Sequence, residues 1–221
     1  MLHPQTLLFL KGLADFNDKK FMDMNRNIYE QIAKSIKVFT KKLIEEIGEF
    51  DPLIKGTPEG KCVFRINRDT RYSHNKLPYK INFGIFIAPG GKTSKYGGYY
   101  LHIQPGASFF GGGIFYPETV DAYAVRQHIY ENPKEFETLL NEKSFKKTFK
   151  NLYSYQPPLK NLPKGMESIG KLDDYLKFKD WLVKDIQISD EEVLSGEMFN
   201  IFVNNAKIMY PMMEFLREGM D

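Results

Sequence analysis

Turn residues recur so closely in the middle of the chain that the segments between them can pair only as antiparallel neighbours. Short runs of apolar, aromatic and β-branched residues with a period of two cover residues 62–67, 82–88, 98–104 and 107–115. The intervening stretches are rich in proline and glycine and are too short for the helical crossovers that parallel strands require. Pro105-Gly106 predicts a tight hairpin. We therefore expect a mostly antiparallel sheet.

Helical periodicity lies on both sides of this region. Before it, apolar residues recur at three- and four-residue steps over 6–14 and 17–47, with Asn17 or Asp18 as the cap of the second helix. After it, the pattern predicts helices over 117–131, 133–140, 142–149 and 172–177, a loop over 156–163, and a strand over 181–188.

A capping box introduces the last helical region. Ser189 stands at the cap position and Glu192 three residues later, where each side chain can bond to the other's backbone amide. The order helices, strands, helices predicts an α+β fold, with a central mostly antiparallel β-sheet flanked by N-terminal and C-terminal helices. We expect a single domain over 1–221, helical in 1–50, β-rich in 61–116, and helical in 117–221 with a strand near 181–188.

Composition narrows the class of protein. A chain of 221 residues, 42% of them hydrophobic, can bury one core without disulfides. Its single cysteine, Cys62, cannot form an internal disulfide, which indicates a reducing compartment, the cytoplasm. The chain has no apolar run long enough to span a membrane, and residues 1–16 lack the basic leader of a secreted protein. We therefore expect neither a membrane partner nor secretion.

Positive charge is concentrated in one short stretch. Residues 61–80 contain six basic residues and a single acid, Asp69, although the whole chain has a net charge of only +3. Arg65, Arg68 and Arg71 repel one another unless an anion lies between them, and guanidinium groups bind phosphate or carboxylate in a bidentate way. We interpret them as anion holders, with Asp69 as their orienting partner or as a base. Further candidate ligand-binding residues are Ser73, Lys76, Tyr79, Lys80 and, after the hairpin, Ser108.

A structural interpretation of the same arginines is equally open. They can form internal ion pairs with helix carboxylates, for which the candidates are Glu45, Glu46, Glu191 and Glu192.

The third run adds groups that can carry a proton. In a strand over 98–104, Tyr100, His102 and Gln104 share one face, opposite Tyr99, Leu101 and Ile103. An imidazole is able to titrate near neutral pH, and the phenol of Tyr100 can donate or accept. If this face also carries Arg65, the strands predicted over 62–67 and 98–104 form one site. In that site His102 is the proton carrier, and Tyr100 and Asp69 are the catalytic partners.

Several familiar chemistries find no support. Gly111-Gly112-Gly113 lacks the spacing of a nucleotide-binding loop and more often marks a bulge or a close backbone approach. The four histidines fall in no short ligand spacing, so we expect no metal, and no motif indicates a cofactor. Cys62 begins an apolar run and is expected to be packed inside.

Four segments carry a resemblance to a known family: FRINRDTRYSHNKLPYKINFGIF at 64–86, APGGK at 88–92, GGYYLHIQPGASFFGGGIFYPE at 97–118 and VRQHI at 125–129. The chain closely resembles the family called domain of unknown function 2461, also described as conserved hypothetical protein family 02453, over essentially its whole length. The resemblance implies one intact domain and directs attention to the same arginine-rich segment. It implies no reaction, cofactor or catalytic residue.

Three functions remain open. The first is a site on the sheet for a small phosphate- or carboxylate-bearing molecule, with hydrolysis or group transfer as the reaction to test. The second is a nucleic-acid-binding module using residues 61–95, with Tyr72, Tyr79, Tyr96, Phe109 and Phe110 available for stacking. The third is a structural domain with an internal ion-pair network. The low net charge favours the small anionic molecule over nucleic acid; the sequence leaves the oligomeric state open.

Overall fold

Helices and strands follow one another along the chain in nearly the predicted order. The computed structural model describes residues 1–71, 74 and 76–220. Before the sheet lie α1 (Thr6–Asp15), α2 (Lys19–Met24), α3 (Arg26–Ile47), the 3-10 turn η1 (Pro52–Ile54) and α4 (Glu59–Cys62). After its first three strands lie α5 (Thr119–Glu131), α6 (Pro133–Asn141), α7 (Lys143–Phe149), η2 (Gly170–Leu172), α8 (Asp173–Lys177), α9 (Asp190–Ser195) and α10 (Glu197–Glu218).

The strands form one antiparallel sheet. In the described part of the chain they are β1 (Phe83–Ile87), β2 (Gly98–Ile103), β3 (Ser108–Ile114), β4 (Leu152–Tyr153) and β5 (Trp181–Ile188), in the spatial order β1-β2-β3-β5-β4. Every neighbouring pair is antiparallel. The predicted α+β fold with helices flanking an antiparallel sheet is confirmed. Sequence periodicity did not predict β4, because two residues are too few to show a period.

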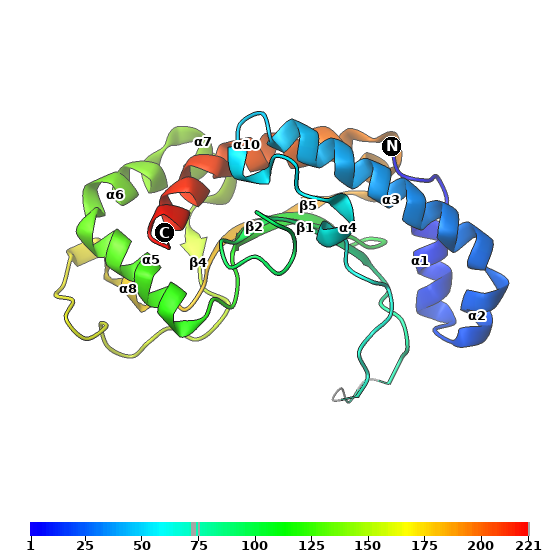
Figure 1. The fold of residues 1–221 in the computed structure, drawn as a ribbon, viewed down its shortest axis with the longest axis horizontal. Helices are drawn as coiled ribbons and strands as arrows, with labels where there is room; N and C mark the ends of the chain where they lie inside the picture. The colour runs from blue at the N-terminus through cyan, green and yellow to red at the C-terminus, as the bar shows by residue number, and fades with distance from the viewer. Residues whose placement is uncertain (72–73, 75, 221) are drawn as a thin grey trace.

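Helices cover one face of this sheet and leave the other open. Figure 1 shows α3 and α10 lying across one face, with the sheet beneath them. On β2, Tyr99, Leu101 and Ile103 are fully buried under these helices, whereas Tyr100 and His102 point the other way and are partly exposed. The second face is open between α5 and α8 at one end and α1 and α2 at the other (Figure 1). The predicted alternation of β2 is confirmed.

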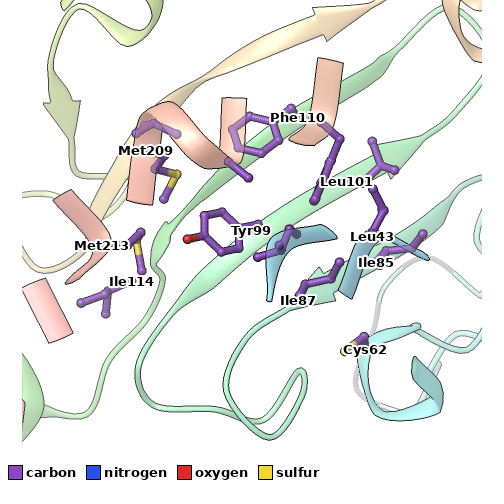
Figure 2. Close-up of a cluster of buried hydrophobic side chains, with 14 of the residues drawn as sticks. Leu43, Cys62, Ile85, Ile87, Tyr99, Leu101, Phe110, Ile114, Met209 and Met213 are labelled. Carbon is purple, nitrogen blue, oxygen red and sulfur yellow. The ribbon is translucent and has the colours of Figure 1, made fainter. Parts of the chain in front are cut away.

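The core fills the space between the helices and the covered face. Leu43 of α3 and Met209 of α10 pack over Leu101 and Phe110 of the sheet (Figure 2). Each such side chain stabilises the fold by about 1.5–3 kcal/mol when it is fully buried. The apolar stripe predicted for the long N-terminal helix faces this core. Among the described residues, no helix combines the length and apolar content needed to cross a membrane.

Two predicted elements differ from the structure. The single helix expected over 17–47 is broken at Asn25, which has the non-helical angles φ −108° and ψ 15° and whose side-chain amide donates to the carbonyl of Phe21. Asp18 caps the first piece, α2, by accepting from the backbone amide of Phe21, as predicted. The capping box of Ser189 and Glu192 is confirmed at the start of α9.

The strand expected over 62–67 is also wrong. Cys62 ends α4, and the segment after it forms isolated bridges, one between Val63 and Ile85 of β1 and one between Asn67 and Tyr79, which lies outside the strands. Pro78 has no backbone N–H, so the pairing of residues 66–68 with 78–80 cannot continue as a regular ladder.

Candidate functional site

The open face of the sheet holds a cavity of about 590 Å³. This volume lies within the range of small-molecule sites. Its floor is made by β1, β2, β3 and β5, and its walls by loops from distant parts of the chain. The lining residues are Phe64, Lys80, Asn82, Gly84, Phe86, Lys92, Ser94, Lys95, Gly97, Tyr100, His102, Phe109, Gly111, Gly112, Gly113, Phe115, Tyr153, Tyr155, Leu182, Val183 and Asp185.

Hydrogen bonds fix the ring of His102 on the cavity floor. Its Nε2 lies 3.0 Å from Oε1 of Gln104, and because an amide oxygen can only accept, Nε2 carries the hydrogen. Nδ1 is then an acceptor, 3.0 Å from the hydroxyl of Tyr100 and 3.4 Å from the side-chain amide of Asn82. The ring of Phe109 stacks on the imidazole at 4.8 Å between centroids. His102 is therefore an oriented imidazole whose Nδ1 lies within hydrogen-bond distance of the Tyr100 hydroxyl.

Tyr100 connects this imidazole to the cavity. Burial, with the nearby charge of Asp185 as a smaller cause, raises the pKa of Tyr100 to about 12. The phenol therefore stays protonated near neutral pH and donates to His102. A molecule bound beside Tyr100 can pass a proton to the phenol oxygen while the phenol's own proton moves to Nδ1 of His102. This geometry is suited to general acid–base chemistry.

A bulge in β5 brings a carboxylate into the same cavity. Phe110 pairs with Ile186 and Gly112 with Val183, so two residues of β5, Lys184 and Asp185, stand opposite one residue of β3. The Asp185 carboxylate lies over Gly111, where an added Cβ would be 2.8 Å from Oδ1. Bulges frequently re-aim a side chain beside a functional site.

Sequence analysis missed Asp185, although the sequence contains a signal for it. In the first half of this strand the apolar residues that would face the core, Trp181 and Val183, have odd numbers. In the second half, Ile186 and Ile188 have even numbers. Such a change of parity within one strand requires an extra residue between the two pairs.

Asp185 has no hydrogen bond or ion pair with the rest of the described chain, and burial raises its pKa, an effect that His102 partly offsets. Ionising Asp185 therefore costs more free energy in the folded state than in the unfolded state. The protein loses stability as pH rises from the ordinary aspartate pKa of about 3.9 through the raised pKa of Asp185 in the folded state. We expect Asp185→Asn to be more stable than the native protein at pH 7, with the difference vanishing below pH 4 in urea unfolding. The exposed substitution Asp15→Asn is the control. A destabilised Asp185→Asn at pH 7 would mean that the carboxylate has a stabilising partner.

Of the six cations in residues 61–80, Lys80 is the one that lines the cavity. Its ammonium lies 5.2 Å from the centre of the Phe64 ring, which stands edge-on to Tyr100. Burial and then the positive charges of Arg65 and Arg68 lower the pKa of Lys80. Within the described residues, no carboxylate lies within ion-pair distance of these three cations. The β1 edge of the cavity is thus electropositive.

The three predicted arginines do not line the cavity. Arg65 is exposed, whereas the ring of its neighbour Phe64 lines the cavity. Arg71 binds the carboxylate of Asp69 at 2.7 Å on an exposed loop, and this contact lowers the pKa of Asp69. The structure places Asp69 with Arg71, away from His102 and Tyr100.

The remaining predicted ligand-binding residues are held by backbone contacts. Lys76 donates to the carbonyl of Thr70 on the exposed loop. Tyr79 is buried, and Asn17 bonds to both its backbone N–H and its carbonyl. The Ser108 hydroxyl is fully buried, donates to the carbonyl of Gln104 and accepts from its N–H, so it closes the hairpin. Ser73 lies outside the described residues.

The triple glycine permits close approach on both sides of β3. At Gly112 an added Cβ would lie 2.9 Å from the Met209 side chain of α10, and at Gly111 it would meet Asp185. The α10 side chain and the Asp185 carboxylate therefore both lie against bare backbone, which agrees with the close backbone approach expected for this glycine run.

In the part of the chain that the structure describes, no three His, Cys, Asp or Glu side chains lie close enough together to hold a metal ion. Cys62 is buried, and burial raises the pKa of its thiol to about 11. The ionisable groups that line the cavity include the imidazole of His102, the phenol of Tyr100, the carboxylate of Asp185 and the lysine ammonium groups.

Comparisons with known proteins identify the family and no nearer relative. No curated protein and no solved structure matches the chain. The sequence model of the family described as "Conserved hypothetical protein (DUF2461)" matches residues 5–215, essentially the whole length. The chain therefore belongs to this family.

Proposed function

We propose that the cavity on the open face binds a small anionic molecule bearing a phosphate or a carboxylate, and that Tyr100 and His102 exchange a proton with it in hydrolysis or group transfer. The observation that carries this proposal is Lys80, a partly buried ammonium beside two arginines that has no carboxylate within ion-pair distance among the described residues. An anionic group at this edge would restore the pKa of Lys80 and relieve the repulsion among the three cations.

Asp185 sets the orientation of such a ligand. Its carboxylate repels a negative group, so the anion belongs at the Lys80 side and the reacting bond beside Tyr100. Burial raises the pKa of Asp185, and a protonated carboxyl at this position can donate a hydrogen bond or a proton to a leaving group.

The two other hypotheses have less support. Of the aromatic residues named for stacking on nucleic acid, only Phe109 lines the cavity; Phe110 and Tyr79 are buried, and Tyr72 lies outside the described residues. The glutamates named as structural partners lie elsewhere: Glu192 caps α9 and Glu45 is beside Lys41. We propose the cytoplasm as the location, on the ground that Cys62 is a free thiol.

Replacing Lys80 tests the proposal. We expect ribose 5-phosphate, pyrophosphate or a small dicarboxylate to bind in isothermal titration calorimetry, and Lys80→Met to weaken that affinity about tenfold or more, because a charge-assisted hydrogen bond is lost. The matched control is Lys76→Met, an exposed lysine that does not line the cavity. Equal affinity in the native protein and Lys80→Met, or no binding of any of these anions, would refute the proposal.

A further inference from the structure

An exposed aromatic corner forms one wall of the cavity. Phe115 and Tyr155 both line it, yet 56% and 67% of their surfaces are exposed; Tyr116, 55% exposed, joins them. The three rings contact one another, with centroids 4.5 Å apart for Phe115 and Tyr116, 5.9 Å for Phe115 and Tyr155, and 6.3 Å for Tyr116 and Tyr155. Clustered exposed apolar side chains beside a cavity mark a binding surface more than scattered ones do.

The backbone beneath Tyr155 is held firmly. The carboxylate of Asp180 is fully buried and accepts from the N–H groups of Tyr155, at 2.6 Å, and Gln156, at 3.3 Å. The Ser154 hydroxyl also donates to the carbonyl of Gln156. A buried carboxylate is costly unless it is well bonded, so its use to fix a loop whose aromatic side chain points into solvent indicates a preorganised contact surface.

The backbone of Tyr116 is also fixed by the surrounding structure. Its φ of +50° is rare for a bulky residue and costs of order 1–3 kcal/mol. Such angles persist where the surrounding structure imposes them, and they cluster at ligand-binding sites. Tyr116 and Tyr155 belong to segments far apart in the chain, so the tertiary fold assembles the corner.

Cations lie beside this corner. Lys92, Ser94 and Lys95 line the cavity on the loop before β2. This loop runs against the end of β3 that leads to Phe115, because an added Cβ at Gly97 would lie 2.5 Å from the carbonyl of Gly113. An aromatic wall and positive charge therefore face one cavity.

We infer that the anionic ligand of the proposed function also carries an aromatic ring, as a nucleoside mono- or diphosphate does, with its base on the ring of Tyr155 or Phe115 and its phosphate on the lysines. This inference rests on the proposed anion site and adds the substrate class. A base has a flat π-face that stacks on exposed aromatic side chains. Its ribose and phosphates then lie over the glycine floor, where Tyr100 and His102 are within the same cavity.

A free nucleotide fits better than a nucleic-acid strand. Tracking a phosphate backbone requires a row of available cations. Lys95 already lies 3.8 Å from Asp121 and donates to the carbonyl of Met220, and Lys92 donates to the carbonyl of Lys61. Among the described residues, Lys80 is the lysine of the cavity whose ammonium has neither an ion pair nor a hydrogen bond to a carbonyl.

Paired ligands with and without a base test the inference in calorimetric titrations of the full chain. Adenosine 5′-monophosphate is compared with ribose 5-phosphate, adenosine 5′-diphosphate with pyrophosphate, and a six-nucleotide single strand of deoxyadenosine is added as a further arm. We expect at least one nucleotide to bind about fivefold or more tightly than its base-free counterpart. Tyr155→Ala should abolish this gain and leave binding of the base-free ligand unchanged. The control Tyr123→Ala, an exposed tyrosine outside the cavity, should change neither.

The outcomes separate the two proposals. If base-free anions bind and depend on Lys80, but neither nucleotide gains from its base, the anion site stands and the inference is overturned. If no anion binds, both fail. If the oligonucleotide binds more tightly than either nucleotide and its affinity falls steeply with salt, the occupant is a nucleic-acid strand, which also overturns the inference.

Discussion

Replacing Arg217 by methionine is expected to lower the free energy of unfolding by about 3–5 kcal/mol. Arg217 of α10 and Asp51 of the loop after α3 are 2% and 1% exposed, and their side chains meet at 2.7 Å. The Tyr99 hydroxyl donates to the same carboxylate oxygen at 2.9 Å, and Arg217 Nε donates to the carbonyl of Tyr96. Without the guanidinium, Asp51 would be a buried carboxylate with one neutral donor.

The phenol of Tyr99 cannot take over the role of Arg217. Burial, and then the charge of Asp51, holds the pKa of Tyr99 well above its usual value, so the phenol remains a neutral donor. Oδ1 of Asp51 and Nη2 of Arg217 are buried without a hydrogen-bond partner among the described residues. Because the pair is incompletely bonded, removing both partners should cost less than removing one.

Urea unfolding followed by the fluorescence of the buried Trp181 measures this effect. The double variant Asp51→Ala with Arg217→Met should recover part of the stability lost in Arg217→Met alone. The control is Arg26→Met, which breaks the exposed pair with Asp23 and should cost far less than Arg217→Met, because solvent screens that pair. Losses of similar size in Arg217→Met and Arg26→Met would show that the buried pair contributes little.

Periodicity and turn chemistry were sufficient for most of the fold. The strand predicted over 181–188 is β5, with the same limits, and the Pro105-Gly106 turn joins β2 to β3. These signals are local, since alternation and turn residues act within a few positions. The two predictions that failed depend on particular contacts. One side-chain hydrogen bond holds the helix break at Asn25, and the pairing of residues 62–67 depends on residues 78–85.

The candidate site was predictable only in part, for the same reason. Strand parity placed Tyr100 and His102 on one face, and the structure has them there, hydrogen-bonded to each other. The count of charges selected residues 61–80, which include Lys80. It did not indicate which cation of this segment enters the cavity, because that depends on the irregular path of the chain after Cys62. Asp185 depends on the bulge, and the aromatic corner depends on contacts between segments about 40 residues apart along the chain.

Gly113→Ala is expected to destabilise the protein by about 3–5 kcal/mol. Gly113 has φ +133°, which side-chain-bearing residues rarely adopt, and an added Cβ would lie 2.1 Å from the carbonyl oxygen of Trp181 and 2.8 Å from Cα of Leu182. These are backbone atoms of the paired strand β5, so neither can move without breaking the ladder that also positions Asp185.

Gly106→Ala separates the two causes. Gly106 has φ +69° in the hairpin turn, and an added Cβ there has nothing within 4 Å. It should therefore cost only the conformational strain, about 1–2 kcal/mol. Urea unfolding followed by circular dichroism compares the variants, and a Gly113→Ala loss no greater than that of Gly106→Ala would contradict the steric argument. A larger loss would show that the third glycine maintains the β3–β5 contact beneath the cavity, which is a structural reason for a glycine run that resembles a phosphate-binding loop only in composition.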